Sequence, residues 1–206
     1  MPDLFDDTPT PDVAWFPDWL SPSTAVSMMA RIIEEVAWRQ DTMGTPAGRV
    51  PLPRLTAWQG ERDAVYVYSG IRNVPDAWTP AVGELKAAAE AACGTRFNSV
   101  LLNRYRSGAD SMGWHADREP ELGDEPVIAS LSLGVTRTFD MRHNRTGATQ
   151  SFLLKSGSLL VMRGRTQAEW RHRVPKEPRV QGERINLTFR YVTSRRTSPL
   201  LKSLDL

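Results

Sequence analysis

The chain has 206 residues, of which 40% are hydrophobic and 24% are charged, and its formal net charge at pH 7 is +2. These values suit one globular domain with a substantial core, and they exclude disordered and fibrous classes. No stretch approaches the ~20 apolar residues of a membrane span, the single cysteine excludes an intrachain disulfide, and the acidic N-terminus lacks a secretory signal. We therefore expect a cytoplasmic monomer without membrane contacts.

The first half of the sequence predicts two helices. Ser21 followed by proline is a typical helix start, and apolar residues continue at helical spacing, so a helix is expected over 22–38. A second helix is expected over 78–93, because Gly94 suits the left-handed conformation that commonly ends a helix. Cys93 then lies at the end of this helix, where a buried structural thiol is expected.

The segments around these helices are predicted to be less regular. Residues 1–12 are acidic and should form a flexible leader, and 194–206 should form a flexible tail. The stretch 41–53 is rich in Gly and Pro and predicts a loop or loose hairpin, whereas 64–69 alternates as a strand does. One domain is expected over 13–193.

The rest of the chain consists of short apolar segments separated by Gly, Asp, Pro or Asn, a pattern typical of strands. Two helices followed by a run of strands indicate an α+β fold, with the helices packed on one side of an antiparallel sandwich. The number of strands fits a jelly roll, or double-stranded β-helix. Strands are expected over 97–105, 127–133, 137–143, 150–155, 158–163 and 185–192.

Three residues predict a metal centre. His115 and Asp117 lie two positions apart, so in an extended chain both side chains point the same way, and His172 lies 55 residues after Asp117. Two imidazoles and one carboxylate form the facial triad that binds Fe(II) and leaves positions open for oxygen and a co-substrate. The third histidine, His143, is interpreted as a packed histidine, and each of the other two taken alone could be one as well.

A late segment, Arg184-Ile-Asn-Leu-Thr-Phe-Arg190, predicts an anion site. Its period of two puts Arg184, Asn186, Thr188 and Arg190 on one face of a strand. Two inward guanidiniums are costly without anions, and the planar fork of Arg184 could hold a dicarboxylate at two points. The alternative is a strand whose polar face meets water. Metal ligands followed by such a clamp are the order expected of an iron- and 2-oxoglutarate-dependent oxygenase.

Six motifs resemble the AlkB family of dealkylating dioxygenases, in particular its DNA-repair branch. They extend from about residue 50 to 192 and cover most of the chain. The combination of His-x-Asp, a distant His and Arg-x-Asn-x-Thr-x-Arg, in order with Asn-x-Tyr, is highly specific. The matching segments are Leu102–Tyr105, His115–Glu119, Ile128–Gly134, Ser156–Met162, His172–Pro175 and Arg184–Arg190.

The resemblance implies roles for individual positions. His115, Asp117 and His172 match the iron ligands of the family. The residues that match its 2-oxoglutarate contacts are Asn103, Tyr105, Arg184, Asn186, Thr188 and Arg190, with the two arginines as carboxylate partners.

The resemblance also implies a substrate side. Residues 40–70 are similar to the substrate-lid region, and in the segment from Tyr66 to Ser69 an aromatic would stack on a flipped base. Tyr68 or Trp58 would provide that surface, and Glu119 matches an acidic residue that faces the damaged base. Stacking on an aromatic contributes ~1–3 kcal/mol per base.

The implied activity is oxidative dealkylation of bases such as N1-methyladenine and N3-methylcytosine in DNA. Fe(II), 2-oxoglutarate and O2 would be required, and succinate, CO2 and an aldehyde would be released. A base inside a duplex must be flipped out or already single-stranded before its alkyl group can react. The segment before the lid offers only Met43 as an apolar wedge, which favours single-stranded or distorted DNA as the partner.

Several alternatives remain open. RNA could be the substrate, the same oxygenase chemistry could act on protein side chains or small molecules, or the chain could be a non-enzymatic nucleic-acid-binding module. Residues 137–206 contain 15 Lys and Arg against five Asp and Glu, which would follow a phosphate backbone or simply form a solvated surface. The aromatic lid residues favour a nucleic-acid substrate.

Overall fold

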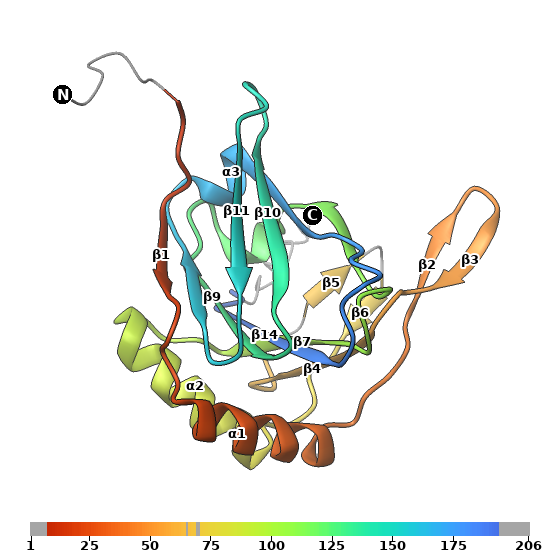
Figure 1. Ribbon diagram of the computed structural model, residues 1–206, viewed down its shortest axis with the longest axis vertical. Helices are drawn as coiled ribbons and strands as arrows, with labels where there is room; N and C mark the ends of the chain where they lie inside the picture. The colour runs from red at the N-terminus through yellow and green to blue at the C-terminus, as the bar shows by residue number, and fades with distance from the viewer. Residues whose placement is uncertain (1–7, 65, 69–70, 194–206) are drawn as a thin grey trace, which may run out of the picture.

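The computed structural model describes residues 8–64, 66–68 and 71–193. Two antiparallel sheets face each other, and the two long helices lie against the outer side of the larger sheet (Figure 1). This is the predicted α+β jelly-roll arrangement. The elements are β1 (Val13–Phe16), α1 (Pro22–Glu35), β2 (Thr42–Thr45), β3 (Gly48–Pro51), β4 (Leu55–Gly60), β5 (Tyr66–Tyr68), β6 (Ile71–Asn73), α2 (Pro80–Cys93), β7 (Ser99–Tyr105), β8 (Met112–His115), the 3-10 turn η1 (Pro120–Leu122), β9 (Ile128–Gly134), β10 (Arg137–His143), β11 (Thr149–Leu154), β12 (Leu159–Met162), α3 (Thr166–Glu169), β13 (Trp170–Val174) and β14 (Arg184–Arg190).

The strand order places β14 near the middle of the larger sheet. This sheet runs β1-β12-β9-β14-β7-β4, and the smaller sheet runs β11-β10-β13-β8. Two further hairpins, β2–β3 and β5–β6, stand apart from both sheets. Because β14 pairs with β7 on one side and β9 on the other, its backbone is bonded on both edges and its seven residues are all buried.

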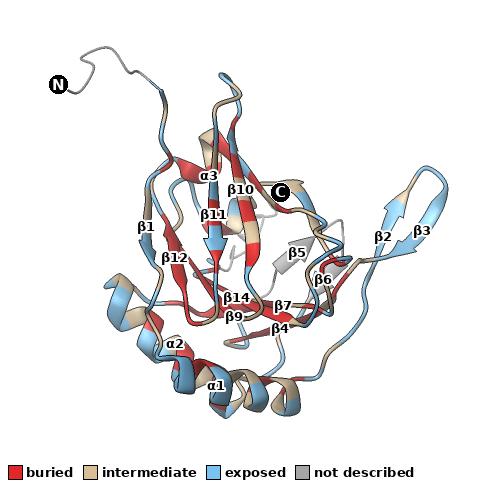
Figure 2. Ribbon diagram, in the orientation of Figure 1, coloured by how far each residue is buried: buried red, intermediate tan, exposed pale blue. Residues whose placement is uncertain are grey.

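Two apolar layers flank the larger sheet. Successive side chains of a strand point to opposite faces, and on β14 the apolar residues, such as Leu187, pack with Ile32 of α1 and Leu85 of α2. A second apolar cluster, which includes Phe139, Leu160 and Trp170, fills the space between the sheets. Figure 2 shows that burial is concentrated in these strands and on the inner sides of the helices.

The helix ends follow local chemistry. Ser21 caps α1, its Oγ accepting from Thr24 N at 3.1 Å. This helix ends at Glu35, three residues earlier than predicted, because Val36 is already extended. The second helix begins at Pro80, two residues later than predicted, since a residue before proline disfavours the helical region.

The end of α2 confirms the predicted cap and corrects one detail. Gly94 adopts a φ of +63° and ends the helix, as predicted. Cys93 is half-buried rather than buried, and desolvation raises the pKa of its thiol.

The six strands predicted after residue 97 are present, with ends within two residues of the prediction. Four other strands of the two sheets were not predicted: β1, β4, β8 and β13. β1 and β8 are only four residues long, and β13 has charged residues at two of its five positions. Long-range pairing defines all four strands. The 41–53 segment forms the β2–β3 hairpin, and the 64–69 prediction coincides with β5, except that 65 and 69 lie outside the described residues. None of the described helices could cross a bilayer.

Candidate metal centre and adjoining polar pocket

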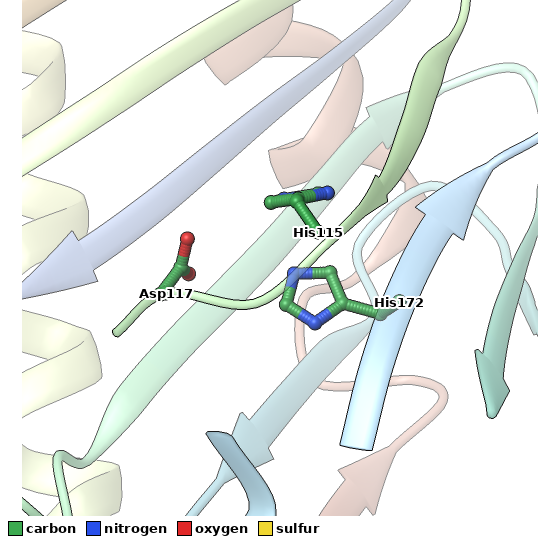
Figure 3. A group of neighbouring side chains, drawn as sticks. All are labelled: His115, Asp117 and His172. Atoms are coloured by element: carbon green, nitrogen blue, oxygen red, sulfur yellow. The ribbon is translucent and has the colours of Figure 1, made fainter. Parts of the chain in front are cut away.

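His115, Asp117 and His172 come together at one end of the smaller sheet. His172 on β13 is the direct cross-strand partner of His115 on β8, and the centroids of their rings are 4.2 Å apart. Asp117 follows on the coil after β8, and one potential ligand atom from each residue lies within 4.8 Å of the others. Figure 3 shows the three side chains gathered from these two segments. The arrangement can hold a single metal ion.

The surroundings keep both imidazoles available as neutral ligands. Nδ1 of His115 lies 2.8 Å from the carbonyl oxygen of Gly113, so donation there leaves Nε2 with its lone pair. His172 is buried and stacks on Phe139 at 5.1 Å. Burial and the neighbouring His115 lower the pKa of His172 to about 3. Metal binding needs unprotonated imidazole, and this environment supplies it.

Asp117 is held as a buried carboxylate. Burial by itself raises the pKa of Asp117, but Arg190 and the two imidazoles outweigh it, so the pKa lies below its usual value. An Oδ2–Nη2 distance of 3.0 Å joins Asp117 to Arg190, and both side chains are 6% exposed. The ligand carboxylate is therefore paired with an arginine of the predicted anion site.

The polar face of β14 is buried, so the water-exposed alternative is wrong. Its four polar residues point between the sheets, each less than 9% exposed. Asn186 Nδ2 donates to Ser130 Oγ at 2.8 Å and to the Leu131 carbonyl at 3.0 Å, and Asn186 Oδ1 accepts from Thr188 Oγ1 at 3.0 Å. Asn186 and Thr188 thus form a hydrogen-bonded floor beside the two arginines.

Arg184 has donors that the described residues do not use. It is 1% exposed, and Nη2 donates to Ser132 Oγ at 2.8 Å. Its Nε and Nη1 are buried without a hydrogen-bond partner among the described residues, and burial lowers its pKa. Nδ1 of His172 and Nε of Arg190 are in the same state. Unpaired buried donors are costly, so the free guanidinium N–H groups fit a carboxylate ligand. The imidazole nitrogen of His172 that carries the lone pair can bind a metal.

Asn103 and Tyr105 of β7 lie opposite β14 in the sheet. Asn103 pairs in register with Asn186, and Tyr105 with Arg184, whose guanidinium lies 5.3 Å from the ring centroid. Asn103 Oδ1 accepts from Arg54 Nε at 2.7 Å, so its amide nitrogen is left for another acceptor. All nine residues predicted to hold the metal and 2-oxoglutarate line one cavity.

The structure adds residues that the sequence did not single out. Arg54 orients Asn103, Ser132 holds Arg184, and Gln167 of α3 accepts from the backbone N–H of Asp117 at 2.9 Å. Arg137 is 1% exposed and pairs with Glu177 at 2.7 Å behind Tyr105. Each acts across 30 or more residues, and of these residues only Ser132 lies in one of the matching segments, Ile128–Gly134. Ser130 and Ser132 lie two positions apart on either side of Leu131, so alternation along the strand could have placed both on its polar face.

The predicted substrate residues whose side chains are described, Trp58 and Glu119, are not among the residues that line the metal cavity. Trp58 is 7% exposed and packs with Ala64, Leu122 and Val192. Glu119 is half-buried and immediately precedes η1. The side chains of Tyr66 and Tyr68, and Ser69 as a whole, lie outside the described residues. The roles of all five residues stay predictions.

The β2–β3 hairpin projects from the body of the molecule (Figure 1). Met43 pairs across the hairpin with Val50, and their exposed fractions are 49% and 41%. The hairpin therefore carries an exposed apolar pair rather than the single methionine that the sequence indicated. His143, the histidine predicted to be structural, lies on β10 with Nδ1 2.9 Å from Thr146 Oγ1 and outside the metal cluster.

Comparison with known proteins identifies relatives over most of the chain. A family model described as the 2OG-Fe(II) oxygenase superfamily matches residues 12–190. The alpha-ketoglutarate-dependent dioxygenase alkB homolog 3 of Rattus norvegicus is 42% identical over 190 residues, which are 87% of this chain and 64% of that protein. Its Homo sapiens counterpart is 41% identical over 190 residues, 87% of this chain and 66% of that protein.

Two further comparisons extend this result. The DNA oxidative demethylase ALKBH2 of Homo sapiens is 36% identical over 149 residues, which are 68% of this chain and 57% of that protein. The solved structure of OsALKBH1 has a TM-score of 0.63 at 19% identity, over 88% of this chain and 99% of that chain, which shows likeness of fold. The chain spans just under two thirds of the length of the alkB homolog 3 proteins that it matches.

Proposed function

Because the chain belongs to the 2OG-Fe(II) oxygenase superfamily and, within it, to the AlkB family, we propose that it removes alkyl groups oxidatively from N-alkylated bases in DNA. N1-methyladenine and N3-methylcytosine are the expected lesions. One observation supports this activity above the others. The fold assembles His115, Asp117 and His172 beside a buried Arg184 that retains two unused donors. The site thus has a place for a metal and a place for a carboxylate.

The three side chains that would bind the metal are already held in place by contacts within the protein. His115 and His172 would hold Fe(II) as neutral imidazoles, and Asp117 would hold it as an anion. Arg190 offsets the negative charge of Asp117, and Phe139 fixes the ring of His172 by stacking. Because these contacts already order the side chains, less conformational entropy is lost when the metal binds.

The co-substrate side follows from the unused donors. Arg184 would donate Nε and Nη1 to one carboxylate of 2-oxoglutarate, with Tyr105 against its guanidinium. Asn103 would donate its amide nitrogen, because Arg54 occupies the oxygen. The Asn186–Thr188 pair uses its own hydrogen bonds on neighbouring strands and shapes the floor of the pocket. The pocket therefore selects an anion through Arg184.

With Fe(II), 2-oxoglutarate and O2 bound, the site supplies the oxidising chemistry that hydroxylates an N-alkyl carbon, after which the adduct collapses to repaired base and aldehyde. The protein has to present the base to this position and exclude water from it. We assign Glu119 to the edge of the damaged base, with Tyr66, Tyr68 and Ser69 in the lid. Trp58 supports this side from the core, where it packs against Leu122.

We propose DNA as the substrate because of the names of the relatives and the positive charge of the last third of the chain. One group of relatives carries the name DNA oxidative demethylase, and the last third of the chain is strongly basic. The exposed β2–β3 tip lacks an aromatic residue, so we retain single-stranded or distorted DNA as the preferred partner. RNA is the second candidate, because a flipped or unpaired base offers the same ring in either polymer.

The test measures formaldehyde and succinate released from a single-stranded oligonucleotide that contains N1-methyladenine, with Fe(II) and 2-oxoglutarate present. The His172→Ala variant should lose turnover. His143→Gln is the matched control, because His143 is an equally buried histidine of the same sheet that lies outside the metal cluster. We expect His143→Gln to keep activity.

The same lesion in RNA and in a duplex separates the remaining substrates. Equal 2-oxoglutarate consumption with methylated and unmethylated oligonucleotide, and no loss of the methyl group, would refute the nucleic-acid proposal. That result would leave oxidation of a protein side chain or a small molecule.

A further inference from the structure

The three metal ligands differ in how the fold holds them. His115 and His172 are opposite each other in the β8–β13 ladder, so backbone pairing sets the distance between them. Asp117 lies beyond the end of β8, and the ladder does not include it. Its place has to be set by side-chain contacts.

Two described contacts hold Asp117. Arg190 binds its carboxylate at 3.0 Å, and Gln167 Oε1 accepts its backbone N–H at 2.9 Å. The first contact occupies one carboxylate oxygen, Oδ2. The second leaves both oxygens available and acts on the backbone, which determines where the side chain starts.

Gln167 is suited to this task by its own surroundings. It is 2% exposed, and Nε2 donates to the sulfur of Met162 at 3.3 Å. The sulfur of Met162 and the N–H of Asp117 together set the orientation of the amide, because the reverse orientation would direct its NH2 group at that N–H. A donor facing a donor in a buried place is unfavourable, so the side chain has one satisfactory orientation.

The short helix α3, which carries Gln167, is itself anchored on two sides. Thr166 Oγ1 donates to the carbonyl of Asp12 at 3.0 Å. Asn144 donates through its side chain to the Ala168 carbonyl at 3.1 Å and through its backbone to the Glu169 carbonyl at 2.8 Å. The chain continues from α3 directly into β13, where His172 lies five residues after Gln167. One segment therefore carries one ligand and fixes another.

We propose that Gln167 is a positioning residue that places Asp117 to complete the metal triad. It does not touch the metal and acts through the backbone of the carboxylate ligand. Groups that orient a metal ligand typically contribute about 10- to 100-fold to metal affinity. The inference concerns the metal centre alone, so its outcome does not depend on whether the substrate is DNA.

The test is a Mn(II) titration of the full chain without 2-oxoglutarate, with free Mn(II) followed by electron paramagnetic resonance. Gln167→Met keeps the length of the side chain and removes the acceptor, and we expect Mn(II) to bind about 10- to 100-fold more weakly. Gln59→Met is the matched control. Gln59 is also 2% exposed, and its Oε1 accepts the backbone N–H of Thr79 at 3.0 Å, away from the metal cluster.

Each variant removes a buried side-chain oxygen that accepts a backbone N–H, so urea unfolding should show destabilisation of both. Mn(II) affinity within twofold of wild type in Gln167→Met would overturn the proposal, as would an equal loss of affinity in Gln59→Met. If Gln167→Met does not fold, Met162→Leu decides the question, because it removes one of the two contacts that hold the Gln167 amide and keeps the apolar bulk. Its Mn(II) affinity should fall, and an unchanged value would refute the positioning role.

Discussion

Replacement of Arg184 by methionine should stabilise the ligand-free protein and abolish its response to 2-oxoglutarate. The guanidinium is 1% exposed and has Nε and Nη1 without partners among the described residues. Each unpaired buried donor costs about 1–3 kcal/mol, and an apolar side chain of similar volume in place of a buried charge is neutral or stabilising by about 1–4 kcal/mol. We expect the free energy of unfolding of Arg184→Met to exceed the wild-type value by about 1–3 kcal/mol.

Stabilisation of the protein by bound 2-oxoglutarate should be lost in the same variant. At a 2-oxoglutarate concentration of about 100 times Kd, binding stabilises the wild type by about 2.7 kcal/mol. For a chain of this size, 1 kcal/mol shifts Tm by roughly 2–4 °C, so thermal unfolding with Mn(II) and 2-oxoglutarate should show a rise of roughly 5–11 °C. Arg184→Met should show none.

Arg137 provides the matched control. It is as buried as Arg184, but it pairs with Glu177 and donates to the carbonyls of Ser107, Asp110 and Pro175. Arg137→Met leaves these acceptors without their donor, at about 1–3 kcal/mol for each buried group, so the variant should destabilise the protein. If urea unfolding shows that Arg184→Met also destabilises the ligand-free chain, or if the variant keeps its 2-oxoglutarate shift, the assignment of the unused donors is wrong.

Three further predictions concern the metal ligands and the hairpin. Asp117→Asn leaves Arg190 buried without its anion and should lower the free energy of unfolding by about 3–5 kcal/mol in urea; an unchanged midpoint would show that the pair contributes little. Since the pKa of His172 is lowered from 6.5 to about 3, the folded chain binds fewer protons than the unfolded chain between these values. The metal-free protein should therefore lose stability as the pH falls from about 6.5 towards 3, and His172→Asn in EDTA should flatten this dependence. Met43→Ser with Val50→Ser should change stability by about 0.5 kcal/mol or less and leave turnover of a single-stranded oligonucleotide unaltered, whereas a drop would place the hairpin on that substrate.

Strong local patterns accounted for the elements that were predicted well. The helices followed from apolar spacing and from caps at Ser21 and Gly94, and the central strands followed from apolar segments between turn residues. The polar face of β14 followed from the period of two in Arg184–Arg190. What alternation could not tell was whether that face meets water or the interior, because both cases have the same pattern. Pairing with β7 and β9 decided it.

Two of the strands that were missed, β8 and β13, are short. β13 alternates charged and apolar residues over five positions, and β8 is four residues long with a glycine in it. Neither would be stable as a separate strand: β13 pairs with β10 on one edge and with β8 on the other, and β8 pairs with β13. The close approach of His115 and His172 is a consequence of that pairing.

The sequence by itself determined which residues could serve as ligands, because the chemistry of two imidazoles, a carboxylate and two guanidiniums is a property of the residues and their order. The tertiary structure decided how they are held. Gln167 reaches Asp117 and Arg54 reaches Asn103 across about 50 residues of chain. Such contacts depend on which strands become neighbours, and the local spacing of residues in the sequence does not predict that.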